Sequence, residues 1–209
     1  STAEREAVIM KFAFDRVNLT EMADELIAIR RDLHRFPESA WTEYRTTVKI
    51  IEQMEKLDLP VRYGKEIHSR ADMYGLPDDR YAQECYRRAK EECGREDLLA
   101  AMEGGFTGCV VEIKGDHPGP VVAIRMDIDC NDVAETLNPE HIPAREGFVS
   151  THPNLMHACG HDGHAAIGIG AIRLLAAYRD QMHGTVRFSR QRKGCAARLR
   201  LPNPVFSMG

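Results

Sequence analysis

The segment MHACGHDGH, residues 156–164, places three histidines, one cysteine and one aspartate within nine positions. Imidazole nitrogens and a cysteine thiolate can bind zinc, manganese and related divalent ions. Cys159 and His161 are two positions apart, so an extended or turning backbone can direct both side chains at one ion. His157 and His164 can serve as further ligands, as outer-shell groups or as substrate contacts. The pattern predicts a metal site, and the alternative is a polar cluster that only supports the fold.

A second group of polar residues stands in the string RMDID, residues 125–129. Side chains alternate between the two faces of a strand, so Asp127 and Asp129 are expected to point the same way. Carboxylates at a strand end beside a loop are well placed to bind a metal or to orient one of its ligands. The other interpretation is that they cap the loop or pair with Arg125 or Arg145. The residues alone favour neither.

The elements around the histidine cluster determine how it is presented. Residues 164–180 are strongly apolar and predict a helix, and a strand is expected at 184–188. A helix start leaves backbone N–H groups free and favours the thiolate form of a nearby cysteine such as Cys159. Gly168 and Gly170 are expected to let the helix pack closely against a sheet.

Two apolar, β-branched stretches at 107–114 and 120–128 are expected to form adjacent strands, joined by the turn sequence GDHPG. With the following helix and strand, they predict an α/β fold that has a central, mostly parallel mixed sheet flanked by helices. Residues 65–103 are polar and irregular except for a helix over 78–92. Because strand-like segments lie on both sides, this stretch is interpreted as an insertion rather than as core.

Two amphipathic helices are predicted near the start of the chain, over 20–35 and 42–57, and Pro37 ends the first. The charged residues of the first helix are interpreted as a solvated surface, Arg30, Arg31 and His34 among them.

The composition excludes several classes of protein. A formal charge of −4 argues against a nucleic-acid binder. No apolar run approaches the ~20 residues that span a bilayer, and no signal peptide is recognised. The six cysteines have no compact disulfide spacing, so a reducing, cytoplasmic setting is expected. Charge is nevertheless uneven, because residues 181–209 hold six Lys or Arg and no acidic residue.

Five motifs together resemble one family. MHACGHDGH and the Gly-containing helix after it look like the amidohydrolase branch of the M20 metallopeptidases, and so do RRDLHRFPESAWTEYRT (30–46) and VVAIRMDID (121–129). RADMYGLPDD (70–79) and AMEGGFTGCV (101–110) are similar to the p-aminobenzoyl-glutamate hydrolase group within that family. The resemblance covers nearly the whole chain up to residue 188.

The resemblance implies a metallo-amidohydrolase that holds two divalent ions, manganese or zinc, and cleaves the amide between an acyl or aroyl group and an amino acid. Cys159 and His161 match the first metal ligands. Asp129 matches an acidic residue that orients a ligand, and Asp127 is its neighbour. The metals supply Lewis acidity and a nucleophile near neutral pH. A glutamate acts as general base.

In the family, that glutamate stands in a Phe-Gln-Pro-Ala-Glu-Glu-Gly string after the last strand predicted here, and its neighbouring glutamate is a metal ligand. Two histidine ligands and a smaller dimerisation domain come later in family chains, which are usually homo- or hetero-oligomers. Here Arg192 and Lys193 occupy the positions of the two glutamates. Neither cation can act as a base or ligand at neutral pH.

A shifted reading frame is our hypothesis for this substitution, and a genuinely divergent tail is the alternative. The codons TTT CAG CCG GCA GAG GAA GGG encode Phe-Gln-Pro-Ala-Glu-Glu-Gly, and loss of one T gives a string that begins TTC AGC CGG CAG AGG AAG. The product is Phe-Ser-Arg-Gln-Arg-Lys, which is the sequence of residues 188–193. We therefore divide the chain into a partial catalytic domain, residues 1–188, and an out-of-frame basic tail, residues 189–209. The dimerisation domain is expected to be absent.

The expected protein is an incomplete and inactive amidohydrolase acting, when complete, on a small N-acyl amino acid such as p-aminobenzoyl-glutamate. The alternative is a non-catalytic module that binds a metal or a partner through the cluster. A third interpretation, acyl transfer with Cys159 as nucleophile, lacks a base paired with it in the sequence.

Overall fold

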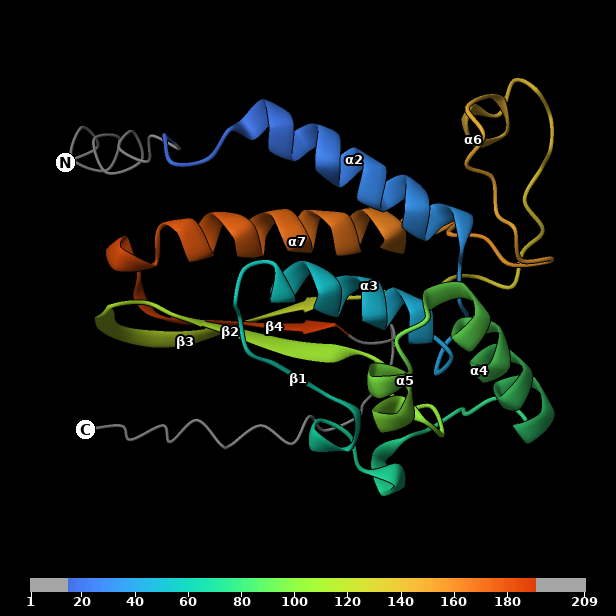
Figure 1. Ribbon diagram of the computed structural model, residues 1–209, viewed down its shortest axis with the longest axis horizontal. Helices are drawn as coiled ribbons and strands as arrows, with labels where there is room; N and C mark the ends of the chain where they lie inside the picture. The colour runs from blue at the N-terminus through green and yellow to red at the C-terminus, as the bar shows by residue number, and fades with distance from the viewer. Residues whose placement is uncertain (1–14, 191–209) are drawn as a thin grey trace.

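A computed structural model describes residues 15–190 of the chain. Figure 1 shows helices stacked over one face of a four-stranded sheet, with α3 and α7 against the sheet and α2 over α7. The helices are α2 (Leu19–Arg35), α3 (Tyr44–Glu55), α4 (Asp79–Cys93), α5 (Glu96–Met102), α6 (Ile142–Arg145) and α7 (His161–Ala177), and short 3-10 turns occupy Gly64–Glu66, Arg70–Asp72 and Arg179–Gln181. Within these residues, no helix is both long and apolar enough to cross a bilayer.

The sheet has the order β1-β2-β4-β3, with β1 at Val61–Tyr63, β2 at Cys109–Lys114, β3 at His117–Met126 and β4 at His183–Arg190. The mixed sheet flanked by helices is confirmed, and among the described strands only β3 and β4 pair in parallel. The prediction that 107–114 and 120–128 form adjacent strands is wrong, because β4 lies between them. Backbone bonds from Gly115 and His117 to residues 184 and 182 attach the turn to the start of β4, which therefore enters between β2 and β3.

The two N-terminal helices begin and end as their caps dictate. Asn18 caps α2 by accepting a hydrogen bond from the N–H of Glu21, and the helix ends two residues before Pro37. The carboxylate of Glu38 accepts the N–H groups of residues 45 and 46, at 2.9 and 2.7 Å. These bonds satisfy two of the free donors at the start of α3.

Helix α7 lies between α2 and the sheet. It begins at His161, three residues earlier than the predicted segment 164–180, so part of the histidine cluster belongs to the helix. A Cβ on Gly170 would stand 2.6 Å from the Cδ1 of Leu26. Gly170 therefore allows close approach to α2, and the expectation that it packs against the sheet is wrong.

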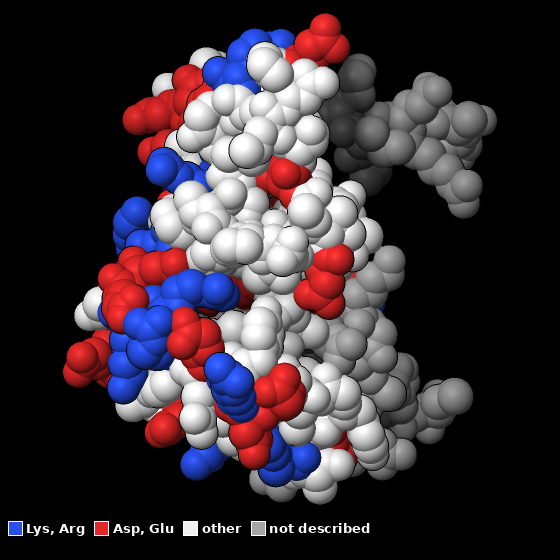
Figure 2. All heavy atoms as spheres, turned by 90° about the vertical axis from the view of Figure 1, so that its right-hand side faces the viewer, with Lys and Arg blue, Asp and Glu red and all other residues white. Residues whose placement is uncertain are grey.

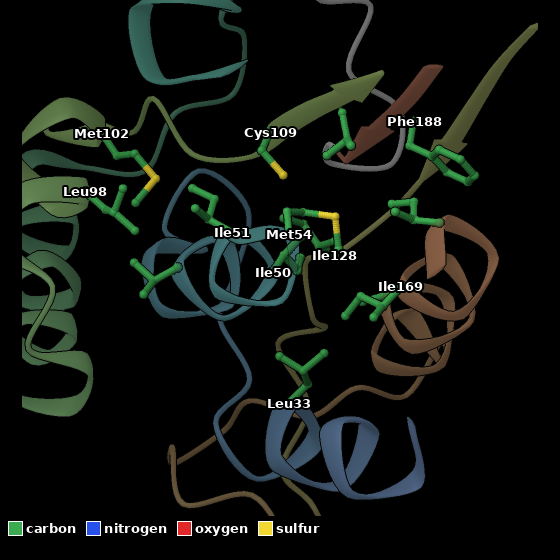
Figure 3. Packing of buried hydrophobic residues seen from close by; sticks show 14 of the residues in the cluster. Leu33, Ile50, Ile51, Met54, Leu98, Met102, Cys109, Ile128, Ile169 and Phe188 are labelled. Atoms are coloured by element: carbon green, nitrogen blue, oxygen red, sulfur yellow. The ribbon is translucent and has the colours of Figure 1, made fainter. Parts of the chain in front are cut away.

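The hydrophobic core fills the space between the sheet, α3 and α7. Figure 3 shows Ile50, Ile128, Ile169 and Phe188 converging there. Burial of each such side chain contributes about 1.5–3 kcal/mol. The helical stretch at 65–103 is confirmed, but its interpretation as separate from the core is wrong, because α4 and α5 place four residues in the same core: Ala89, Leu98, Leu99 and Met102.

The close contact between β3 and β4 yields a test of the topology. Gly184 has φ +86°, and a Cβ there would lie 2.0 Å from the carbonyl oxygen of Pro120. We expect Gly184→Ala to lower the free energy of unfolding by more than about 2 kcal/mol, since left-handed strain and a backbone collision act together. Gly163→Ala, which meets nothing within 4 Å and lies in α7, should be neutral or stabilising. Urea unfolding of both variants provides the measurement, and equal stabilities would contradict the strand order.

Candidate metal centre

The first turn of α7 presents two histidines on one face. Gly160 precedes the helix in the left-handed conformation, with φ +76°. His161 and His164 are three positions apart on the helix, and their rings stack with centroids 5.2 Å apart. The parallel strands β3 and β4 end near the start of α7 (Figure 1). The histidines thus lie at the edge of the sheet where ligands bind in α/β folds.

Asp129 holds the ring of His161 in one orientation. The Nδ1 of His161 is 2.8 Å from the carbonyl oxygen of Asp129 and 3.0 Å from its Oδ1. A carbonyl oxygen can only accept, so Nδ1 carries the proton and Nε2 keeps its lone pair. His161 is buried, with 5% of its surface exposed. An imidazole fixed in this way is prepared to bind a metal through Nε2.

Asp127 completes a group of three. Ligand atoms of Asp127, His161 and His164 all lie within 4.8 Å of one another. Asp127 also forms an ion pair with Arg125, whose Nε is 3.2 Å from Oδ1. The pairing of Asp127 with Arg125 is therefore confirmed, and its role as a metal ligand stays a prediction. Arg145, the other cation considered, pairs instead with Glu146.

Cys159 lies outside this group in the described part of the chain. Its side chain is exposed, and its N–H donates to the Oδ1 of Asn131 at 3.1 Å. Its role as a ligand stays a prediction. His164, for which the sequence left a ligand or an outer position open, lies within the group.

His157 is buried, with 4% of its surface exposed, and neither ring nitrogen has a hydrogen-bond partner within residues 15–190. Burial lowers the pKa of His157 to about 4. The positive charges of His34 and Arg30 also lower this pKa, whereas the negative charge of the nearby Asp162 raises it. The ring is therefore neutral at neutral pH. Such unpaired buried nitrogens indicate a group that binds there.

The donor set fits a divalent metal. Two imidazoles and a carboxylate are ligands that zinc accepts, and manganese accepts the carboxylate readily. The bond from Asp129 to the far nitrogen of His161 is the carboxylate–histidine arrangement that metal sites use to fix a ligand. The unpaired nitrogens of His157 lie in the same segment. These observations together favour a metal centre over a purely structural cluster.

A second polar network supports the start of α7 from behind. The Nδ1 of His34 is 2.8 Å from Asp162, and its Nε2 is 2.8 Å from Glu135. Arg30 also contacts Asp162, at 2.8 Å. The interpretation of these α2 residues as a solvated surface is wrong for His34, of which only 2% is exposed. It is confirmed for Arg30 and Arg31, whose side chains are 37% and 41% exposed.

The same network fixes the long loop before α7. Glu135 accepts the N–H of Ser150 at 2.6 Å and lies 2.7 Å from the Nε2 of His141. Burial opposes the charge of His34, but its hydrogen bonds to Asp162 and Glu135 outweigh that effect and raise its pKa. Burial likewise opposes the charge of both carboxylates, and His34 keeps their pKa values below the usual range. The three groups therefore favour the charged form of one another.

Comparison with known proteins agrees with this geometry. Residues 123–192, which include the aspartates and the cluster, match the model of peptidase family M20/M25/M40. The chain is 38% identical to a p-aminobenzoyl-glutamate hydrolase subunit of Escherichia coli over 81% of its length. It is 40% identical to indole-3-acetyl-aspartic acid hydrolase of Enterobacter agglomerans over the same share. The chain belongs to the M20 peptidase family.

Solved structures show the same fold. An aminobenzoyl-glutamate utilization protein from Klebsiella pneumoniae matches 84% of this M20 chain with a TM-score of 0.65 and 30% identity, and 37% of that structure is covered. A dinuclear metal-binding M20 peptidase from Bacillus subtilis matches 83% with a TM-score of 0.58 and 32% identity, and 36% of it is covered. The chain spans 39% of the length of each of the two relatives named above.

Removing the carboxylate that orients His161 should weaken metal binding. Asp129→Asn keeps the size of the side chain but removes its charge, so we expect affinity for zinc or manganese to fall about 10–100-fold. Asp116→Asn, a change at an exposed carboxylate in the turn between β2 and β3, is the matched control. Competition with a chromophoric chelator measures both variants. Equal affinities in the two variants would show that Asp129 does not act on the site.

The ionised network predicts a specific pH dependence. The pKa of His34 is raised on folding, so its stabilising effect is complete below the unfolded value of ~6.5 and is lost as the pH rises through the folded value. We expect His34→Gln to lower the free energy of unfolding by roughly 1.5–3 kcal/mol at pH 5.5 and by less at pH 8.5. Urea unfolding at both pH values measures the difference.

The exposed His183 is the control for this change, and His183→Gln should cost little at either pH. A cost for His34→Gln that does not vary with pH would mean that His34 stabilises the fold as a neutral group.

Proposed function

We propose that this chain carries part of the active site of a metal-dependent amidohydrolase that cleaves the amide of an N-acyl or N-aroyl amino acid. One observation carries the proposal: in an M20 chain, Asp129 fixes the buried His161 while Asp127 and His164 face it within 4.8 Å. The group is placed at the sheet edge where α/β enzymes bind their substrates.

The names of the relatives narrow the substrate. Indole-3-acetyl-aspartic acid and p-aminobenzoyl-glutamate each join an aromatic acyl group to an acidic amino acid. We propose the same class for this chain, with p-aminobenzoyl-glutamate as the first compound to test. For protein partners and localisation, the family is the only basis. We propose on that basis that the complete enzyme is cytoplasmic and forms oligomers.

The residues have distinct roles in this proposal. Asp127, His161 and His164, together with Cys159, would hold metal ions, two manganese or zinc ions in a complete site. When bound, such ions polarise the amide carbonyl and supply a nucleophile near neutral pH. Asp129 keeps the proton on Nδ1 of His161, so that Nε2 keeps the lone pair with which it would bind an ion. The hydrogen-bonded network of His34 keeps the start of α7 in place.

The general base is the missing part. Arg192 and Lys193, at the positions of the two family glutamates, lie outside the described residues. Strand β4 continues to Arg190, and Ser189 is buried opposite Val110. Strands pair through backbone atoms, so this register is compatible with either reading frame. We propose that residues 189–209 are out of frame and that residues 1–188, with their insertion at 65–103, are the functional part.

The proposal predicts little hydrolysis by the 209-residue chain. Loss of a general base alone costs about 10²–10⁴-fold in rate. We expect turnover of p-aminobenzoyl-glutamate, assayed with added manganese or zinc, to fall at least that far below the activity of the Escherichia coli relative. Chelation should abolish any remainder. Robust turnover by this chain would overturn the idea that it is incomplete.

The coding DNA downstream of the GTVRF codons tests the frame itself. Restoring one base should produce a Gln-Pro-Ala-Glu-Glu string, and the protein made from the corrected gene should hydrolyse the substrate when metal is present. A corrected gene without that string would end the frame hypothesis. A corrected protein that binds one ion tightly but has no activity would favour the alternative, a non-catalytic metal- or partner-binding module.

A further inference from the structure

A polar cavity opens beside the metal centre, and part of its wall comes from the insertion. Its volume is about 630 Å³, within the usual range for small-molecule sites. It reaches Asp129, whose Oδ1 holds His161. Gly75, Pro77 and Tyr81 form the wall that the insertion supplies. A ligand in this cavity would therefore touch both the metal centre and the insertion.

The insertion wall is held firmly in place. The Asp78 side chain caps α4 by accepting the N–H of Tyr81 at 3.0 Å. The Tyr81 hydroxyl in turn lies 2.9 Å from the Oγ of Ser39, which also lines the cavity. Trp41 donates to the carbonyl of Tyr74 at 2.8 Å, next to Gly75. These contacts fix the wall relative to the segment between α2 and α3.

The charges of the lining select one half of the substrate. Asp129 and Asp132 contribute carboxylates, and no described residue of the lining is Lys or Arg. Figure 2 views this end of the molecule, where charged side chains crowd the left margin and the lower part and leave the middle largely uncharged. A carboxylate placed among these acids without a cation is repelled. The acidic amino-acid half of the substrate is therefore a poor occupant.

The same lining suits an aromatic group that carries an N–H donor. Ala40, Pro77, Pro153 and Leu155 offer apolar surface, which a ring can cover. The carboxylate of Asp132 is exposed and available to accept a hydrogen bond. Hydrogen bonds to charged acceptors are the stronger ones. An amino-substituted benzoyl group or an indole meets both requirements.

Resting on the proposed function, we propose that this cavity binds the aromatic acyl half of the substrate, with the insertion as its specificity element and Asp132 as acceptor of the aryl N–H. The amino-acid half lies outside it. The cavity distinguishes acyl groups by their hydrogen-bond donors, and the insertion sets the size of ring that fits.

Two neutral amides test the proposal on the chain as it exists, without catalysis. In chelator-treated protein, 4-aminobenzamide should shift the backbone amide NMR signals of Gly75, Asn131 and Asn154. Benzamide, which lacks the amine, should bind about five- to tenfold more weakly. N-Acetylglutamate, a probe for the amino-acid half, should leave the three signals unmoved. Shifts of these signals by N-acetylglutamate, or an equal affinity of the two benzamides, would overturn the assignment.

Variants separate the acceptor from the wall. Asp132→Asn should bring the ratio of the affinities for 4-aminobenzamide and benzamide close to one. Asp79→Asn is the matched control, because this carboxylate begins α4 but lines a different cavity, and it should leave the preference unchanged. Tyr81→Ala, checked for native circular dichroism, should weaken both amides several-fold and keep their ratio.

Failure of this proposal can be told apart from failure of the proposed function. If the frame-corrected protein hydrolyses p-aminobenzoyl-glutamate but the backbone amide signals of the cavity do not shift, only the proposal for the cavity is wrong. If the cavity binds 4-aminobenzamide selectively but the corrected protein does not hydrolyse the substrate, the enzymatic proposal is wrong and the proposed binding site stands.

Discussion

A buried carboxylate at the first turn of α7 is the constraint on which the site depends. Asp162 has 1% of its surface exposed, so it must be paired to remain charged. Arg30 and His34 of α2 supply the partners. Because Asp162 directly follows His161, the same ion pairs that attach α2 to α7 also fix the helix turn that presents His161 and His164, the candidate metal ligands. Asp162 therefore both holds the two helices together and positions the candidate site.

Much of the site could be read from the sequence, because its ligands lie in short strings. The spacing in MHACGHDGH and RMDID placed Asp127, Asp129 and His161 near one another, and the structure brings them together. The pattern of β-branched residues likewise identified β2, β3 and β4. These features depend on local order, namely strand alternation and the position of a helix start.

The rest depended on contacts between distant segments, which no local pattern records. His34 stands 128 residues before Asp162. Charged residues on an amphipathic helix usually face solvent, so nothing in the local pattern predicts that His34 is buried. The order of the strands depended on where β4 enters the sheet. Leu98 and Met102 of the insertion joined the core although their segment is polar overall. In each case the outcome depended on a partner far along the chain.

Burial is the main reason why the pKa of His157 is low, and its neighbour His34 acts in the same direction. The two rings lie 6.3 Å apart, and His34 carries the charge because two carboxylates bind it on either side. His157 has no such partner among the described residues, and burial together with the nearby cations lowers its pKa to about 4. A proton on His157 would add a buried charge beside the candidate metal site. The positive charge that the two carboxylates favour on His34 therefore adds to the effect of burial and helps to keep the imidazole of His157 neutral.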